Sequence, residues 1–224
     1  MASSTLPPIG ARLRAARHRR GVSVRGLARE IGVSASLISQ IETDKSSPSV
    51  STLYAISTAL DLSLEELFSD ETADAGAPEL DDDSDEALPL SAANGLVRGL
   101  VTAGPLGRRR LGPLVTPDQR ELLTLDSGVT WELLGQIPGV HVDFLLITYP
   151  PGGSSSGPGL LMRHTGTEFG YVISGELTLT LGFQTHRLAA GDSVSFDSAT
   201  PHAYRNETTE PAVGVWFVLE HLAA

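Results

Sequence analysis

The chain has 224 residues, of which 41% are apolar, so it is long enough for one large domain or two modest ones with a real core. It contains no cysteine, which excludes disulfides, thiolate catalysis and zinc–thiolate sites. The formal net charge of −11 argues against a nucleic-acid partner only if that charge is spread evenly. However, residues 1–29 hold seven arginines and no acidic residue, whereas Asp70–Glu86 holds nine acidic residues and no basic one. The basic end can therefore approach phosphates while the acidic segment keeps the rest of the molecule away from them.

The sequence predicts a protein with no membrane contact. It does not open with a basic stretch followed by an apolar one, so we expect no signal peptide. The longest apolar run, Ala212–Leu219, is far too short to cross a bilayer and predicts a buried strand. Together with the lack of cysteine, these features fit a cytoplasmic location.

Apolar residues recur every three or four positions between about Ile9 and Phe68, and this spacing predicts helices. Serines that can cap helices and glycines that can end them divide the segment. The predicted helices are Ile9 to about Arg20, Val24–Ile31, Ala35 to about Glu42, about Val50–Leu60 and a short Leu64–Phe68.

The rest of the chain changes character twice. Residues 69–95 are acidic, interrupted by proline and poor in apolar side chains, which predicts a flexible linker. From about Leu96 onward, short β-rich runs alternate with Gly, Pro and Asp turns, which predicts an antiparallel sandwich or barrel. The expected domains are therefore 1–68, helical, and 96–224, all-β, joined by the acidic linker 69–95.

The stretch SVRGLAREIGVSASLISQIE, with the IETDKSSPSVSTLYAISTAL that overlaps and follows it, has the spacing of a helix-turn-helix. It resembles the XRE type of helix-turn-helix, the phage-repressor class. The resemblance implies that Ala35–Glu42 enters the major groove of double-stranded operator DNA, where Gln40 can pair with an adenine edge. The residues expected at the DNA are Ser23, Arg25, Ser34, Ala35, Ser36, Ser39, Gln40, Lys45 and Ser46. Arg17 and Glu42 match a pair that commonly forms an internal salt bridge in this family.

Two stretches of the β-rich part carry histidines: MRHTGTEFGYVISGE and GDSVSFDSATPHAYRN. They resemble the two motifs of the cupin barrel, over about Leu122–Leu222. The first motif of that family has one more histidine, in whose place Met162 stands here. The fold class implied is an all-α helix-turn-helix bundle followed by an all-β cupin (double-stranded β-helix) barrel.

The second histidine and the glutamate of the first motif are His164 and Glu168, and the histidine of the second motif is His202. Two imidazoles and one carboxylate on one face can form a facial triad for a divalent metal such as Fe, Zn, Mn or Ni. Met162 is a poor ligand for a hard metal, so a polar pocket that binds an effector without a metal is the alternative. The predicted effector pocket consists of Met162, His164, Glu168, Tyr171, Phe196, His202 and Tyr204, and the residues expected to complete it or its core are Phe144, Leu146, Phe169 and Trp216.

These resemblances imply a transcription regulator that binds DNA and is controlled by a small molecule in the barrel, more often as a repressor than as an activator. One recognition helix reads few bases, so we expect a homodimer. The alternative is a mononuclear iron epoxidase or oxidase that also joins such a bundle to a cupin and uses a His164, Glu168 and His202 triad. In those enzymes the bundle contributes a lysine to the active site, at the position aligned with Gly21. A third interpretation is a binding protein whose helical bundle only mediates assembly.

Overall fold

The computed structural model of the chain describes residues 9–62, 67, 114–135 and 142–219. Its first part is a bundle of four helices: α1 (Ile9–Arg19), α2 (Val24–Glu30), α3 (Ala35–Glu42) and α4 (Val50–Leu60). These bounds confirm the third and fourth predicted helices, and the first two end one residue earlier than predicted. The predicted linker lies outside the described residues, as does the predicted fifth helix apart from the buried, helical Leu67.

Serine side chains begin three of these helices. Ser23, Ser34 and Ser49 accept hydrogen bonds from backbone N–H groups in the first turns of α2, α3 and α4, respectively. The turn between α2 and α3 passes through Gly32, whose φ of +73° suits a residue without a side chain. Gly10 allows α1 to approach the end of α3, because a Cβ there would lie 2.1 Å from the carbonyl oxygen of Ile41. The core of the bundle is formed by fully buried apolar side chains, among them Leu13, Leu27, Ile38, Ile41, Leu53, Ile56 and Leu60.

The second part is built from two antiparallel sheets. The larger sheet has the order β1-β2-β3-β9-β4-β7, and the smaller one has the order β6-β5-β8. The strands are β1 (Leu122–Thr124), β2 (Thr130–Gly135), β3 (Val142–Tyr149), β4 (Thr167–Ser174), β5 (Glu176–Leu181), β6 (Gln184–Ala189), β7 (Ser193–Asp197), β8 (His202–Arg205) and β9 (Ala212–Leu219). Short 3₁₀ turns lie at Pro117–Gln119 and Asp126–Gly128. The arrangement agrees with the predicted cupin barrel, whereas β6 was not among the predicted strands because its exposed, polar QTHRLA has little apolar alternation.

Burial alternates along the strands, which sets an inner and an outer face. In β3, Asp143, Leu145, Ile147 and Tyr149 are buried and the residues between them are half-buried. Trp131 and Trp216 are both 1% exposed and fill the inside of the larger sheet. The interior therefore combines large aromatic rings with a few polar side chains.

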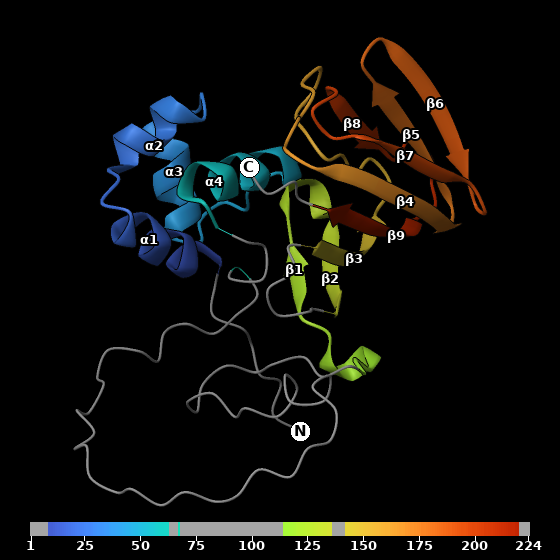
Figure 1. Cartoon of the computed structure of the whole chain (residues 1–224), viewed down its shortest axis with the longest axis horizontal. Helices are drawn as coiled ribbons and strands as arrows, with labels where there is room; N and C mark the ends of the chain where they lie inside the picture. Colours follow the sequence, from blue (N-terminus) through green and yellow to red (C-terminus); the bar gives the residue numbers. More distant parts are fainter. Residues whose placement is uncertain (1–8, 63–66, 68–113, 136–141, 220–224) are drawn as a thin grey trace, which may run out of the picture.

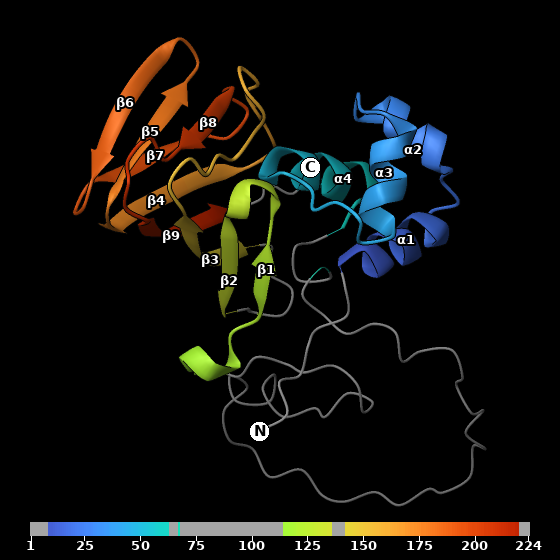
Figure 2. The same cartoon turned by 180° about the vertical axis from the view of Figure 1, so that it is seen from behind.

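The bundle and the barrel lie side by side, with α4 as the helix nearest the strands in both views (Figures 1 and 2). Two backbone hydrogen bonds join them. The Ser51 N–H donates to the carbonyl oxygen of Ser155, and the Asp126 N–H donates to that of Pro48, both at 2.9 Å. The start of α4 is thus fixed to two loops of the barrel.

Candidate functional site

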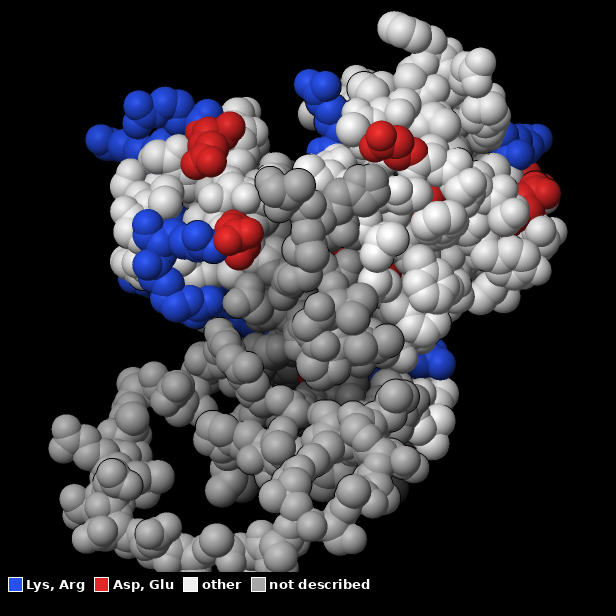
Figure 3. Space-filling model, viewed as in Figure 1, with Lys and Arg blue, Asp and Glu red and all other residues white. Residues whose placement is uncertain are grey.

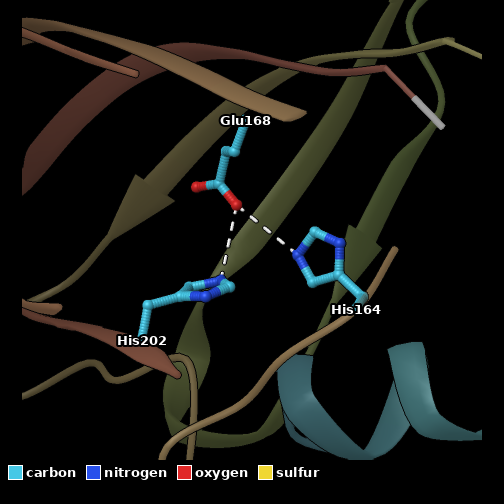
Figure 4. A group of neighbouring side chains, drawn as sticks. All are labelled: His164, Glu168 and His202. Atoms are coloured by element: carbon cyan, nitrogen blue, oxygen red, sulfur yellow. Dashed lines mark ion pairs between the residues drawn. The ribbon is translucent and has the colours of Figure 1, made fainter. Parts of the chain in front are cut away.

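Three polar side chains meet inside the barrel, each from a different local structure. His164 lies in the extended segment before β4, where its backbone N–H donates to the carbonyl oxygen of Ser198. Glu168 is the second residue of β4, and His202 is the first residue of β8. All three are buried, at 9%, 3% and 0% exposure, and Figure 4 shows both imidazoles directed at the same carboxylate.

Hydrogen bonds determine which nitrogen of each ring faces that carboxylate. Nδ1 of His202 lies 2.8 Å from the carbonyl oxygen of Thr200, and Nδ1 of His164 lies 3.3 Å from that of Thr165. A carbonyl oxygen can only accept, so each Nδ1 carries a proton, and Nε2 presents a lone pair when the ring is neutral and an N–H when the ring is protonated. Backbone partners of this kind orient the histidine ligands of metal sites.

The two Nε2 atoms are buried and have no hydrogen-bond partner. They lie 3.5 Å (His164) and 3.4 Å (His202) from Oε2 of Glu168, which is longer than a good hydrogen bond. Lone pairs that face a carboxylate oxygen in a dry interior are costly unless a proton or a cation lies between them. The arrangement is therefore complete only with a positive charge at its centre.

Glu168 is held as a carboxylate. Burial raises its pKa, but its interactions with both imidazoles and with the Tyr204 hydroxyl outweigh this effect and lower the pKa from 4.5 to about 2. The Tyr204 hydroxyl donates to Oε1 at 2.7 Å and accepts from Nε1 of Trp216 at 3.2 Å. Burial, and then the charge of Glu168, raise the pKa of both Tyr204 and Tyr149, so these phenols stay protonated. Oε1 is thus satisfied by the protein, and Oε2 is directed to the two histidines.

The donor set fits a divalent metal. The three ligand atoms lie within 4.8 Å of one another. Ligands bound at 2.0–2.2 Å and at right angles stand about 3 Å apart, so a small closure of the observed spacing would satisfy an ion. Two imidazoles with one carboxylate suit Fe, Zn, Mn or Ni. Among the described residues these three make up the one such group.

The predicted pocket residues divide into two sets. Met162 and Tyr204 are buried, Met162 pairs its backbone with His202, and the half-buried Phe196 ring contacts the His202 ring at 4.9 Å. Tyr171 is different: it is 50% exposed and lies on the outer face of β4, so its place in the predicted pocket is wrong. Phe144, Leu146 and Phe169 also lie on the outer face. The physical reason is the two-residue period of a strand, because Glu168 points inward and every odd-numbered neighbour along β4 then points outward.

Two aromatic residues beside the site were not predicted. The Tyr54 ring of α4 stacks on the His164 imidazole, with centroids 4.2 Å apart and planes 4° apart. Trp131 of β2 meets Tyr54 edge-on at 5.5 Å. Tyr54 lies in the helical part of the sequence, 110 positions before His164, so no local pattern connects them.

Most of the residues predicted to contact DNA are exposed. Ile38 and Ile41 are each 1% exposed, whereas Ser36, Ser39 and Gln40 are exposed on the opposite side. Of the other predicted contacts, Ser23, Arg25, Ser34 and Lys45 are exposed, and Ala35 and Ser46 are half-buried. The hydroxyls of Ser23 and Ser34 also cap their helices.

The predicted Arg17–Glu42 salt bridge is present and joins α1 to α3. The guanidinium donates twice to the carboxylate, at 2.5 and 2.9 Å, and once to the carbonyl oxygen of Val22 at 2.7 Å. Both side chains are buried. The pair therefore fixes the helix that carries the exposed serines and Gln40.

Comparison with known proteins agrees with this architecture. A helix-turn-helix family model matches residues 13–67, and a cupin domain model matches residues 145–218. The HTH-type transcriptional regulator PuuR of Escherichia coli (strain K12) is 31% identical over 208 residues, which is 92% of this chain and 91% of that protein. The values are the same for PuuR of Shigella flexneri. The crystal structure of an HTH_3 family transcriptional regulator from Vibrio cholerae is 21% identical and covers 96% of both chains with a TM-score of 0.60, which supports the fold.

A helix-turn-helix with an exposed α3, followed by a cupin barrel, defines a two-domain DNA-binding protein of the XRE type. The chain belongs to the family of HTH-type transcriptional regulators that includes PuuR. This relationship supports a transcription regulator. In the described part of the chain, no helix is long and apolar enough to cross a membrane.

Proposed function

We propose that this regulator binds its operator as a homodimer in the cytoplasm, acts there as a repressor, and is controlled by a small molecule held in the cupin barrel. The observation that supports this most directly is the exposed face of α3. The side chains of Ser36, Ser39 and Gln40 are exposed and do not pack into the bundle core. A helix with short polar side chains on its outer face fits the major groove of B-DNA.

The charge distribution supports this orientation. Residues 9–62 contain eight Lys and Arg against four Asp and Glu, in a chain with 16 basic and 27 acidic residues. In Figure 3 the basic side chains gather over the helical bundle, and few lie over the strands. Arg25 and Lys45 are exposed on the bundle, where they can contact phosphates, which position a protein on DNA.

The effector site is proposed at His164, Glu168 and His202. Its support is the pair of buried Nε2 atoms that face an ionised carboxylate without a hydrogen-bond partner. A divalent metal bound there would offer open coordination positions to a small molecule. A cationic group of the effector itself would satisfy the same atoms.

The homodimer is proposed to form through the outer face of the larger sheet. Large apolar side chains of β4 and β9 are 42–50% exposed there: Phe169, Tyr171, Ile173, Phe217 and Leu219. Phe217 is paired with Phe169 in register and stacks on Phe144 of β3 at 4.3 Å. No charged residue lies on this face of β3, β4 and β9, so two strongly acidic copies can meet on it without repulsion. A dimer supplies the two recognition helices that an operator requires.

A mobility-shift experiment with the upstream DNA of the protein's own gene, at stated salt, tests the DNA-binding proposal. Gln40→Ala and Ser36→Ala should weaken specific binding, by roughly 5- to 150-fold for a lost bidentate adenine contact. Binding to unrelated DNA should change little. Thr58→Ala, at an exposed position of α4, is the matched control and should leave specific binding unchanged. Specific binding that survives both α3 substitutions would reject the assignment of this helix to the groove.

A further inference from the structure

The strongest unexplained feature of the molecule is the contact between its DNA-binding bundle and the polar site of the barrel. Tyr54 belongs to α4 but is only 8% exposed, because its ring is enclosed by the barrel. One face of the ring covers the His164 imidazole, and the ring makes a T-shaped contact with Trp131. Figure 4 shows the helix passing beside His164. The helical domain therefore forms one wall of the site.

Backbone hydrogen bonds between the bundle and the barrel lie close to this contact. The backbone bonds Ser51–Ser155 and Asp126–Pro48 hold the start of α4 on the barrel within two turns of Tyr54. Only the residues 43–49 separate α4 from the recognition helix α3, and the side chains of Leu53 and Ile41 share one core. A change in the position of α4 on the barrel would consequently move α3 as well.

We propose that Tyr54 is the positioning residue through which occupancy of the His164, Glu168 and His202 site is coupled to the docking of the DNA-binding bundle. This inference rests on the proposed effector site. A cation at Nε2 of His164 withdraws electrons from the imidazole and strengthens its attraction to the electron-rich face of the tyrosine ring. An occupied site therefore favours the docked position of α4, and by reciprocity the docked bundle favours occupancy.

The coupling has a chemical requirement that separates it from simple packing. It needs an aromatic ring at position 54, but it does not need the phenolic hydroxyl. Tyr54→Phe should keep it, and Tyr54→Ala should lose it. Thr58→Ala changes the same helix at an exposed position and serves as the surface control.

The test uses the full chain, stripped of metal with a chelator, and Zn²⁺ alone as the probe, measured by titration calorimetry. Wild type, Tyr54→Phe and Thr58→Ala should bind Zn²⁺ with similar affinity. Tyr54→Ala should bind it roughly 5- to 150-fold more weakly, the usual range of a coupling between sites. Circular dichroism and size-exclusion chromatography confirm that each variant is folded. Where the Ala variant is unstable, a folded Tyr54→Phe protein that binds Zn²⁺ more weakly than wild type would overturn the proposal that the ring alone is required.

A second readout does not depend on metal affinity. In hydrogen exchange, the backbone amides of the α4 start, including that of Ser51, should become more protected on Zn²⁺ binding in wild type and not in Tyr54→Ala. Equal Zn²⁺ affinity and equal protection in Tyr54→Ala and wild type would overturn the coupling while leaving the metal site intact. Absence of Zn²⁺ binding by wild type would reject the metal site itself, and with it this role of Tyr54.

Discussion

At the scale of single residues, the site is organised by hydrogen bonds that leave three ligand atoms free. Backbone carbonyl oxygens accept hydrogen bonds from Nδ1 of both histidines, and the Tyr204 hydroxyl donates a hydrogen bond to one oxygen of Glu168. What remains is Nε2 of each imidazole and Oε2 of the carboxylate. The ligand atoms are therefore set by their neighbours before any ion or effector arrives, which reduces the free-energy cost of binding.

Replacement of the central carboxylate should empty the site of metal. Glu168→Gln keeps the shape and an oxygen that can accept from Tyr204, but it removes the negative charge between the imidazoles. We expect the metal content of the purified protein, measured by elemental analysis, to fall from near one per chain to near zero. Glu207→Gln changes an exposed carboxylate of the same domain and should retain the metal. Equal metal contents in the two variants would contradict the assignment of Glu168 as a ligand.

The lowered pKa of Glu168 predicts a dependence of stability on pH. The pKa is about 2 in the folded chain and 4.5 ordinarily, so the folded state binds this proton less readily than the unfolded state. The resulting stabilisation is present above about pH 4.5 and is lost as the pH falls towards 2. The free energy of unfolding in urea of the protein stripped of metal should therefore decrease over this window more steeply for wild type than for Glu168→Gln. Parallel curves for the two proteins would show that Glu168 does not titrate as described.

At the scale of elements, a buried ion pair helps to fix the position of α3. Arg17 of α1 and Glu42 of α3 are both buried, and Glu42 raises the pKa of Arg17 through their hydrogen bonds. Gly10 and the hydrogen bond from its N–H to Asp44 add a second contact between α1 and the end of α3. The exposed residues of α3 are thus presented by a rigid support.

Removal of one member of the pair should destabilise the bundle more than removal of both. Arg17→Met leaves Glu42 buried and unpaired, which costs about 3–5 kcal/mol in comparable cases, whereas Arg17→Met with Glu42→Leu leaves no buried charge. We expect denaturant unfolding followed by circular dichroism to show this order. Arg20→Met, which breaks the exposed pair with Asp61, should change stability by less than about 1 kcal/mol. A double variant as unstable as the single one would indicate that packing, and not charge, dominates.

At the scale of the whole molecule, three different surfaces are available for the three proposed interactions. The exposed face of α3 is available to DNA, the inner face of the strands encloses the polar site, and the outer face of the larger sheet presents apolar rings. The α4 helix touches both the bundle core and the polar site. The surfaces proposed for dimerisation, ligand binding and DNA binding are therefore separate.

A charge on the outer sheet face should dissociate the homodimer. Phe217→Glu places a carboxylate among Phe144, Phe169 and Leu219, where a second copy would have to bury it. We expect analytical ultracentrifugation to show a monomer, with correspondingly weaker operator binding. The control is Phe183→Glu, because Phe183 is fully exposed in the turn between β5 and β6. A Phe217→Glu protein that stays dimeric would exclude this face.

The sequence by itself determined most of the fold. Serine caps, glycine stops and apolar spacing are local signals, and the approximate bounds that they predicted for α3 and α4 agree with the structure. The motifs around His164, Glu168 and His202 predicted the site, because their spacing is tied to the strands that carry them. Strand β6 was not predicted, since a polar edge strand is defined by its partner β5 and not by its own alternation.

Only the tertiary structure decided which face of each strand turns inward and which parts of the chain meet. Tyr171 was predicted in the pocket and lies outside it, because one inward residue fixes the direction of all others in β4. Tyr54 was not predicted at the site, because its contact with His164 is made by docking one domain on another. Contacts between distant segments follow from how whole surfaces fit together, and a sequence pattern within one element carries no record of that fit.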